Sequence, residues 1–198
     1  MRILVVEDEK LLCDGIAEDL ELEKYTVERC YDGAEAYDLL LKEDFPSWLY
    51  QVKKGATTIW EHWDGMKDDG SMWSADMNSF NHYAYGAIGE WMYRAMAGIE
   101  ADSEHPGFKH AILYPRIGGN LKYTAGKYHS IYGDVGVKWE VQGKQITLTV
   151  QIPVNTTAEI RLDQAKAVLE SDGLTFTREA DYMAAEAGSG TYHIAFEQ

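Results

Sequence analysis

The spacing of apolar residues at the start of the chain indicates two strands and a helix. Residues 3–6 form a short, wholly apolar run, which is typical of a buried parallel strand. Residues 11–22 carry apolar positions at roughly helical spacing, and residues 25–30 have the pattern of a second short strand. A strand, a helix and a strand in this order predict one βαβ unit.

Two helices are predicted in the middle of the chain. Asp44-Phe45-Pro46 indicates a helix start, because proline is favoured at the first helical position, and Gly55 indicates the end of that helix. Its apolar face is predicted to contain Trp48, Leu49 and Val52.

The second helix is predicted over residues 83–96. Apolar residues recur there in pairs every four positions, the clearest amphipathic pattern in the chain, and Asn78 or Ser79 can cap its start.

After Pro106 the apolar period changes to two, and the runs are bounded by Gly, Pro and Asn. This pattern predicts an antiparallel β-sandwich, with a hairpin turn at Gln142-Gly143-Lys144 and an α+β fold for the whole chain.

Charge and cysteine content narrow the classes of partner. The 198 residues contain 18 Lys and Arg against 33 Asp and Glu, a formal charge of -15 that repels nucleic acid and anionic lipid. We therefore predict neither a nucleic-acid partner nor a membrane partner.

Only two cysteines are present, Cys13 and Cys30, and the N-terminus does not resemble a signal peptide, so we expect a cytoplasmic location. Three histidines in the strand region, His110, His129 and His193, share no metal-ligand spacing. We therefore predict no metal and no cofactor.

The first 33 residues contain two short acidic motifs. The words VVEDE and YTVERCYDGAEA resemble the opening of a response-regulator receiver domain, in which an acidic pair holds magnesium beside a phosphorylated aspartate. Here the pair would be Glu7 and Asp8. The strand that should deliver the acceptor aspartate is replaced by FPSWLYQVKKGATT, so we expect a truncated receiver-like segment over residues 1–35 with a vestigial pair.

A loop between the two predicted helices carries the candidate chemistry. Its sequence, TTIWEHWDG at residues 57–65, combines two tryptophans, two acids and a histidine. Indole faces stack on sugar rings and a carboxylate between them orients water, so this cluster suits a saccharide site. In the alternative interpretation, the two tryptophans pack against neighbouring helices while the acids cap a helix or remain solvated.

Three long blocks then follow one another in order: FPSWLYQVKKGATTIWEHWDG, NSFNHYAYGAIGEWMYR and PGFKHAILYPRIGGNLKY. They resemble the end of the catalytic domain and the following β-sandwich of glycoside hydrolase family 78 α-L-rhamnosidases. The resemblance covers residues 36–198. It implies that residues 36–104 are a helical remnant of an (α/α)6 barrel and that residues 105–198 form the C-terminal sandwich.

The same resemblance implies roles for individual residues. Enzymes of this family hydrolyse terminal α-L-rhamnose with inversion, using one carboxyl group as acid and another as base. Glu61 matches the general base, Trp60 and Trp63 would form sugar-facing walls, and Asp64 is their neighbour. His82 matches a histidine that contacts rhamnose; the alternative is a helix-start histidine bonded to the nearby loop.

The segment with the family's general acid has no counterpart in the sequence. We therefore expect a fragment of an inverting α-L-rhamnosidase. Its ligands would be rhamnose-containing glycosides, and the fragment alone would have little or no hydrolytic activity. Two alternatives remain open: a non-catalytic carbohydrate-binding or structural β-sandwich module, and a phosphorelay receiver. Helices severed from a barrel expose apolar faces, so we also expect self-association.

Overall fold

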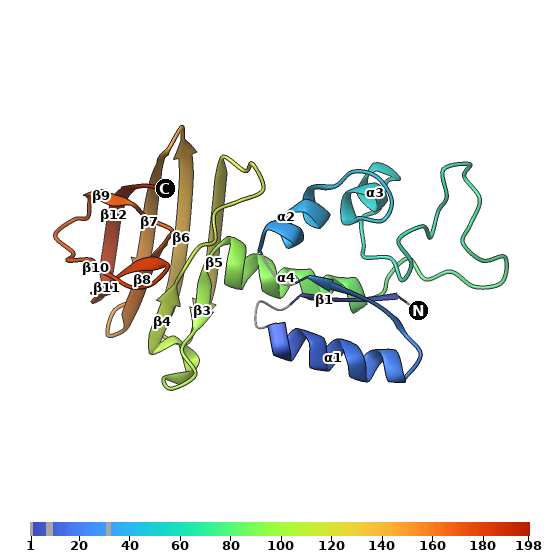
Figure 1. Ribbon diagram of the computed structural model, residues 1–198, viewed down its shortest axis with the longest axis horizontal. Helices are drawn as coiled ribbons and strands as arrows, with labels where there is room; N and C mark the ends of the chain where they lie inside the picture. Colours follow the sequence, from blue (N-terminus) through green and yellow to red (C-terminus); the bar gives the residue numbers. More distant parts are fainter. Residues whose placement is uncertain (1, 7–9, 31–32) are drawn as a thin grey trace. The chain divides into compact units, whose positions relative to one another are not determined.

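The computed structural model describes residues 2–6, 10–30 and 33–198, which form two compact units, Met1–Gly89 and Glu90–Gln198 (Figure 1). The predicted acidic pair, Glu7 and Asp8, lies outside the described residues. No helix of the described ranges is long and apolar enough to cross a membrane.

The first unit begins with β1 (Arg2–Val6), α1 (Lys10–Leu22) and β2 (Thr26–Cys30). The strands are parallel, with Val5 opposite Arg29, so the predicted βαβ unit is confirmed. Its small core contains Val5, Cys13 and Ala17, all of which are buried.

Two further helices follow, α2 (Gly33–Leu41) and α3 (Trp48–Lys53). The prediction that Pro46 opens the helix is wrong, because the Ser47 hydroxyl caps α3 by accepting a hydrogen bond from the Tyr50 amide at 3.0 Å. Gly55 has a φ of 89° directly after the C-cap, which confirms the predicted helix end.

The buried face of α3 also differs from the predicted one. Trp48, Tyr50 and Gln51 are buried, whereas the side chain of Val52 is 58% exposed. The reason is local: a six-residue helix buries the side that its neighbouring loop covers, and that loop is bonded to Gln51.

Residues 84–96 are helical throughout but change geometry twice. A 3₁₀ turn, η1 (Ala84–Ala87), leads into α4 (Ile88–Trp91) and then the π-helical η2 (Met92–Met96). The predicted caps are wrong, because the Asn78 side chain bonds to the Ser74 backbone instead and Ser79 is not the N-cap. On the predicted apolar face, Trp91 and Ala95 are buried, whereas Tyr83, which precedes η1, is 88% exposed. The self-association stays a prediction.

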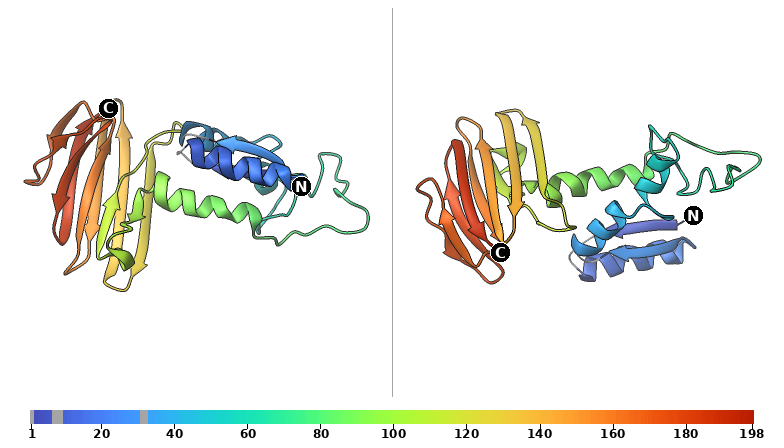
Figure 2. Two further views of the ribbon diagram at one scale, coloured as in Figure 1. Left: turned by 60° about the horizontal axis from the view of Figure 1, so that its bottom comes forward. Right: turned by 90° about the horizontal axis from the view of Figure 1, so that it is seen from above.

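The second unit is a two-layered sandwich (Figure 2). One sheet has the order β10-β11-β8-β4-β3, and the other has the order β5-β6-β7-β12-β9. The strands are β3 (Ile99–Ala101), β4 (His110–Leu113), β5 (Tyr123–Ser130), β6 (Gly133–Gln142), β7 (Gln145–Ile152), β8 (Thr157–Asp163), β9 (Ala167–Glu170), β10 (Thr177–Arg178), β11 (Tyr182–Ala187) and β12 (Gly190–Glu197). A short 3₁₀ turn, η3 (Pro106–Phe108), precedes β4.

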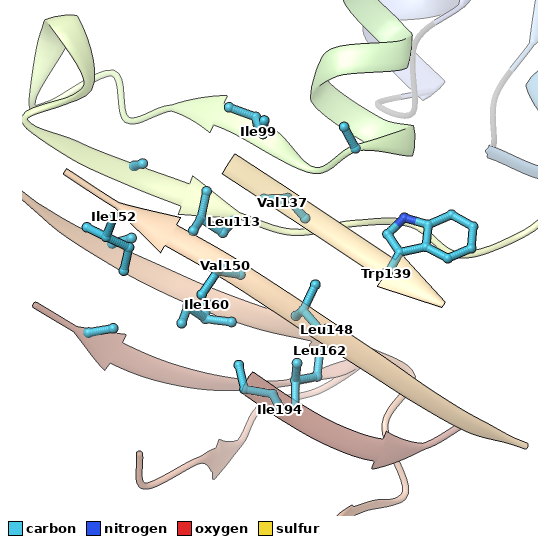
Figure 3. Close-up of a cluster of buried hydrophobic side chains, with 14 of the residues drawn as sticks. Ile99, Leu113, Val137, Trp139, Leu148, Val150, Ile152, Ile160, Leu162 and Ile194 are labelled. Carbon is cyan, nitrogen blue, oxygen red and sulfur yellow. The ribbon is translucent and has the colours of Figure 1, made fainter. Parts of the chain in front are cut away.

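The core of the sandwich lies between the two sheets, where alternate side chains of both layers point toward one another (Figure 3). Trp139, Leu113 and Ile160 are each fully buried there. The predicted sandwich and its hairpin turn, with Gln142 opposite Gln145, are therefore confirmed.

Two details of the predicted sandwich need correction. β4 and β8 pair in parallel, because β5, β6 and β7 intervene in the other sheet before the chain returns to β8 in the same direction as β4. In addition, β3 pairs with β4, so the sandwich includes residues that the sequence interpretation placed in the helical segment 36–104.

Candidate functional site

The loop between α3 and η1, residues 57–82, carries the predicted site (Figure 1). Gln51 on α3 is 2% exposed and fixes the backbone of this loop. Its amide nitrogen donates to the carbonyl oxygen of His62 at 3.1 Å, and its amide oxygen accepts from the Trp60 N–H at 3.4 Å. One buried side chain therefore holds the residue on each side of Glu61.

The two ends of the loop are also bonded to each other. The Glu61 N–H donates to the Ser79 carbonyl oxygen at 3.0 Å, and the His82 N–H donates to the Ile59 carbonyl oxygen at 2.8 Å. These bonds pair the two segments in an antiparallel sense. The fold thus brings Glu61 and His82, which are far apart in the sequence, onto neighbouring segments.

Trp60 and Trp63 lie in the interior of the unit, 4% and 6% exposed. The Trp60 ring meets Phe80 edge to face at 4.9 Å. The Trp63 ring stacks on Tyr85 at 3.9 Å and meets Trp48 edge to face at 4.9 Å. This placement corresponds to the packing alternative for the two tryptophans, and it leaves little indole surface for a ligand.

The two acids of the loop are half-buried. Among the residues that the structure describes, neither the Glu61 nor the Asp64 carboxylate makes a hydrogen bond or an ion pair. The backbone of Glu61 is therefore fixed on three sides while its carboxylate keeps its full capacity to accept hydrogen bonds from water or a ligand.

The His82 side chain bonds to the first residue of η1. Its Nδ1 accepts a hydrogen bond from the Ala84 N–H at 3.2 Å, as the helix-start alternative for this residue requires. Because Nδ1 accepts, the proton of the neutral ring lies on Nε2, which is then a hydrogen-bond donor. The same ring stacks beside Tyr83, with centroids 5.2 Å apart.

Sequence reasoning assigned no role to Gln51, Tyr50 or Trp73, and it named the histidine of the loop, His62, without a partner. Gln51 follows Trp48 by three positions, and that spacing places it on the buried face of α3. The rings of His62 and Trp73 stack at 3.7 Å, and Trp73 is 45% exposed. The Tyr50 hydroxyl donates a hydrogen bond to the Met66 carbonyl oxygen of the loop at 3.0 Å. Burial raises the pKa of this hydroxyl.

Substitution of Gln51 tests whether its amide holds the loop. Gln51→Leu keeps the approximate volume but removes both hydrogen bonds, leaving a buried N–H and a buried carbonyl oxygen unpaired, at a cost of about 2 kcal/mol. We expect the Trp60 amide to exchange its hydrogen roughly thirtyfold faster than in the unsubstituted chain. Gln142→Leu, at an exposed hairpin position, is the control. Unchanged exchange in Gln51→Leu would show that the loop is held by other contacts.

Comparison with known sequences identifies two matching families. The bacterial alpha-L-rhamnosidase 6 hairpin glycosidase domain matches residues 29–96, and the bacterial alpha-L-rhamnosidase C-terminal domain matches residues 98–176. An α-L-rhamnosidase of Streptomyces avermitilis is 41% identical over 162 residues, which is 80% of this chain and 15% of the relative. One from Formosa agariphila is 40% identical over 143 residues, or 71% of this chain and 15% of the relative.

Solved structures give the same result. The Streptomyces avermitilis α-L-rhamnosidase complexed with L-rhamnose superposes with a TM-score of 0.74 at 39% identity, covering 81% of this chain and 16% of the relative. The α-L-rhamnosidase from Dictyoglumus thermophilum superposes with a TM-score of 0.71 at 26% identity, covering 92% and 20%. These matches do not support the receiver-like interpretation of residues 1–33, which stays a prediction.

The chain spans only about 15% of the length of the curated relatives described above. The two matched regions are adjacent and together run from residue 29 to residue 176. These residues therefore belong to the bacterial α-L-rhamnosidase family, of which this chain carries a small C-terminal region.

Proposed function

We propose that this chain carries the general-base part of an inverting α-L-rhamnosidase site, with Glu61 as the base. The observation that supports the proposal most strongly is the combination of a fixed backbone and an unpaired carboxylate at Glu61. A base must be held in place while remaining free to accept a proton from water, and both conditions are met at this residue. The residue also lies inside the region that matches the glycosidase domain.

In an inverting hydrolase, the base removes a proton from water as that water attacks the anomeric carbon. An acid on the opposite side of the sugar protonates the leaving oxygen. The carboxyl groups of the acid and the base are about 6.5–9.5 Å apart in such enzymes. His82 can contribute by donating from Nε2 to a sugar hydroxyl, because its Nδ1 is already occupied by Ala84. Asp64 provides a second open carboxylate in the same loop.

The tryptophans have a supporting role in this proposal. The rings of Trp60 and Trp63 are packed into the interior of the unit, so their contact with a sugar is limited to the small exposed fraction of each ring. Trp73 offers more open indole surface, and its stacking on His62 fixes the ring. We assign the sugar-stacking role to Trp73 together with the exposed edges of the other two indoles.

The proposal predicts that the 198-residue polypeptide alone hydrolyses methyl α-L-rhamnoside, whose poor alkoxide leaving group requires protonation, no faster than its Glu61→Gln variant. The reason is that no segment of the 198 residues resembles the family's acid, and the loss of a general acid costs about 10²- to 10⁴-fold in rate. Release of L-rhamnose by both proteins at high concentration is the measurement. Glu61-dependent turnover of about 1 s⁻¹ or faster would contradict the absence of an acid.

A non-catalytic carbohydrate-binding or structural module is the second candidate. The sandwich supports it, because this unit has a core of its own that extends between its two sheets. Binding of L-rhamnose by the chain, together with a kcat that Glu61→Gln leaves unchanged in an enzyme completed with the missing segments, would favour this candidate over a site centred on the loop.

A further inference from the structure

We propose that the edge of the sandwich carries a second binding site, for a neutral saccharide, in a pocket between β3, β5 and the helix that ends at Met96. The pocket has a volume of about 440 Å³ and lies wholly within the unit Glu90–Gln198. That volume is within the range of small-molecule sites, about 300–1,000 Å³. Its chemistry comes from three aromatic residues and three charged ones: Tyr93, Phe108, Tyr128, Glu90, Arg94 and Glu100.

The aromatic residues give the pocket a surface on which a sugar ring can stack. Tyr93 and Tyr128 are 49% and 42% exposed, although large rings are usually more deeply buried than this. Phe108 packs against Tyr128 with ring centroids 4.5 Å apart, so two of the three rings form one surface. The C–H face of a pyranose would cover this surface and remove it from water.

The backbone at Phe108 adds a second observation. Phe108 has a φ of 65° and the preceding Gly107 a φ of 78°. The left-handed conformation is unfavourable for a bulky non-glycine residue, so it persists only where surrounding contacts impose it. This turn places the Phe108 ring in the pocket, a costly arrangement of the kind that gathers at ligand sites.

The charged groups determine which ligands fit. Glu90 and Arg94 form an ion pair, with Nε and Oε1 3.0 Å apart, and Glu100 adds a further carboxylate from β3. Two carboxylates and one guanidinium leave the pocket with a net negative charge, which repels phosphate, sulfate and carboxylate ligands. Carboxylates accept hydrogen bonds from hydroxyl groups, so a neutral polyol with an apolar face matches the whole set.

The walls of the pocket are held rigidly. The Trp139 indole N–H donates to the Met96 carbonyl oxygen at 2.9 Å, and the Arg116 N–H donates to the Ala95 carbonyl oxygen at 2.8 Å. Gly126 of β5 permits close approach of Ala97, since a Cβ at position 126 would lie 2.5 Å from the Ala97 Cβ. The helix end is thus fixed to the sheets, and little conformational entropy is lost when a ligand binds.

Titration of the 198-residue chain with methyl α-L-rhamnoside and with methyl β-D-glucoside, followed by NMR, tests the proposal. We expect saturable shifts of residues around Tyr93 and Tyr128 with at least one of the two probes. Tyr128→Ala should weaken the affinity about tenfold, because it removes half of the stacking surface. Tyr123→Ala is the matched control, since Tyr123 lies on the same strand, is 53% exposed and does not line the pocket.

Further variants separate this site from the loop of Glu61. Glu61→Gln should leave the affinity at the pocket unchanged, and Glu100→Gln should lower it while preserving the spectrum of the folded chain. The proposal does not depend on the proposed hydrolase function, so it can hold where that function fails. Absence of saturable binding by the folded chain would overturn it. A second outcome would also overturn it: the parent chain is an oligomer without sugar affinity, and Tyr128→Ala dissociates that oligomer. The pocket would then be a contact between protein chains.

Discussion

The Gly98→Ala variant is expected to lose most of the stability of the unit Glu90–Gln198. Gly98 has a φ of 74°, and a Cβ at this position would lie 2.1 Å from the Pro115 nitrogen and 2.4 Å from the Tyr114 carbonyl carbon. Both atoms are backbone, so no side chain can rotate away. The Tyr114 N–H also donates to the Gly98 carbonyl oxygen at 2.8 Å, which holds the two segments together.

The expected cost has two parts. The left-handed conformation costs alanine roughly 1–2 kcal/mol, and the clash forces β3 away from β4, for a total of about 4 kcal/mol or more. Urea unfolding of the sandwich is the measurement. Gly143→Ala is the matched control, because Gly143 has a φ of 65° but no atom within 4 Å of the added Cβ. A loss below about 1.5 kcal/mol in both variants would contradict the close approach at Gly98.

Local sequence patterns predicted the positions of the strands and helices better than they predicted which strands pair with each other. The apolar period of two identified the strands, and Gly143 identified the hairpin, because both depend on neighbours in the sequence. The parallel pairing of β4 with β8 was not predictable in this way, since it depends on which sheet the three intervening strands join. The start of α3 was also missed, because Pro46 and Ser47 are both favourable at a helix start and only the structure distinguishes them.

The candidate site shows the same division. The composition of residues 57–65 indicated a cluster of functional interest, but an indole suits a sugar wall and a packed interior equally well. Burial of Trp60 and Trp63 depends on Phe80 and Tyr85, which are distant in the sequence. Gln51 was missed because a glutamine on a short helix is usually solvated, and its role follows only from the loop that covers it.

Glu61→Gln should abolish most of the activity in a chimera that supplies the rest of the enzyme. In this chimera, the aligned 162 residues of this chain replace their counterpart in the Streptomyces avermitilis relative. An amide cannot accept a proton from water, whereas it keeps the size and shape of the carboxylate. The loss of a general base costs about 10²- to 10⁴-fold in rate. The fall should be in kcat with little change in KM, because the base acts on water in the transition state.

Glu43→Gln is the control in the same chimera. Glu43 is an exposed carboxylate that pairs with Lys53 on the surface, and surface pairs of this kind contribute little. Its kcat should stay within about twofold of the parent. The equivalent substitution in the intact relative, at the glutamate that aligns with Glu61, keeps the test informative where the chimera folds poorly.

The ratio of kcat between the chimera and its Glu61→Gln variant is the most direct measurement of the central claim, that the Glu61 carboxylate activates water. We expect a ratio of about 10² to 10⁴ for two proteins with the same far-UV circular dichroism. A ratio near one, with Glu43→Gln equally active, would show that a different group is the base.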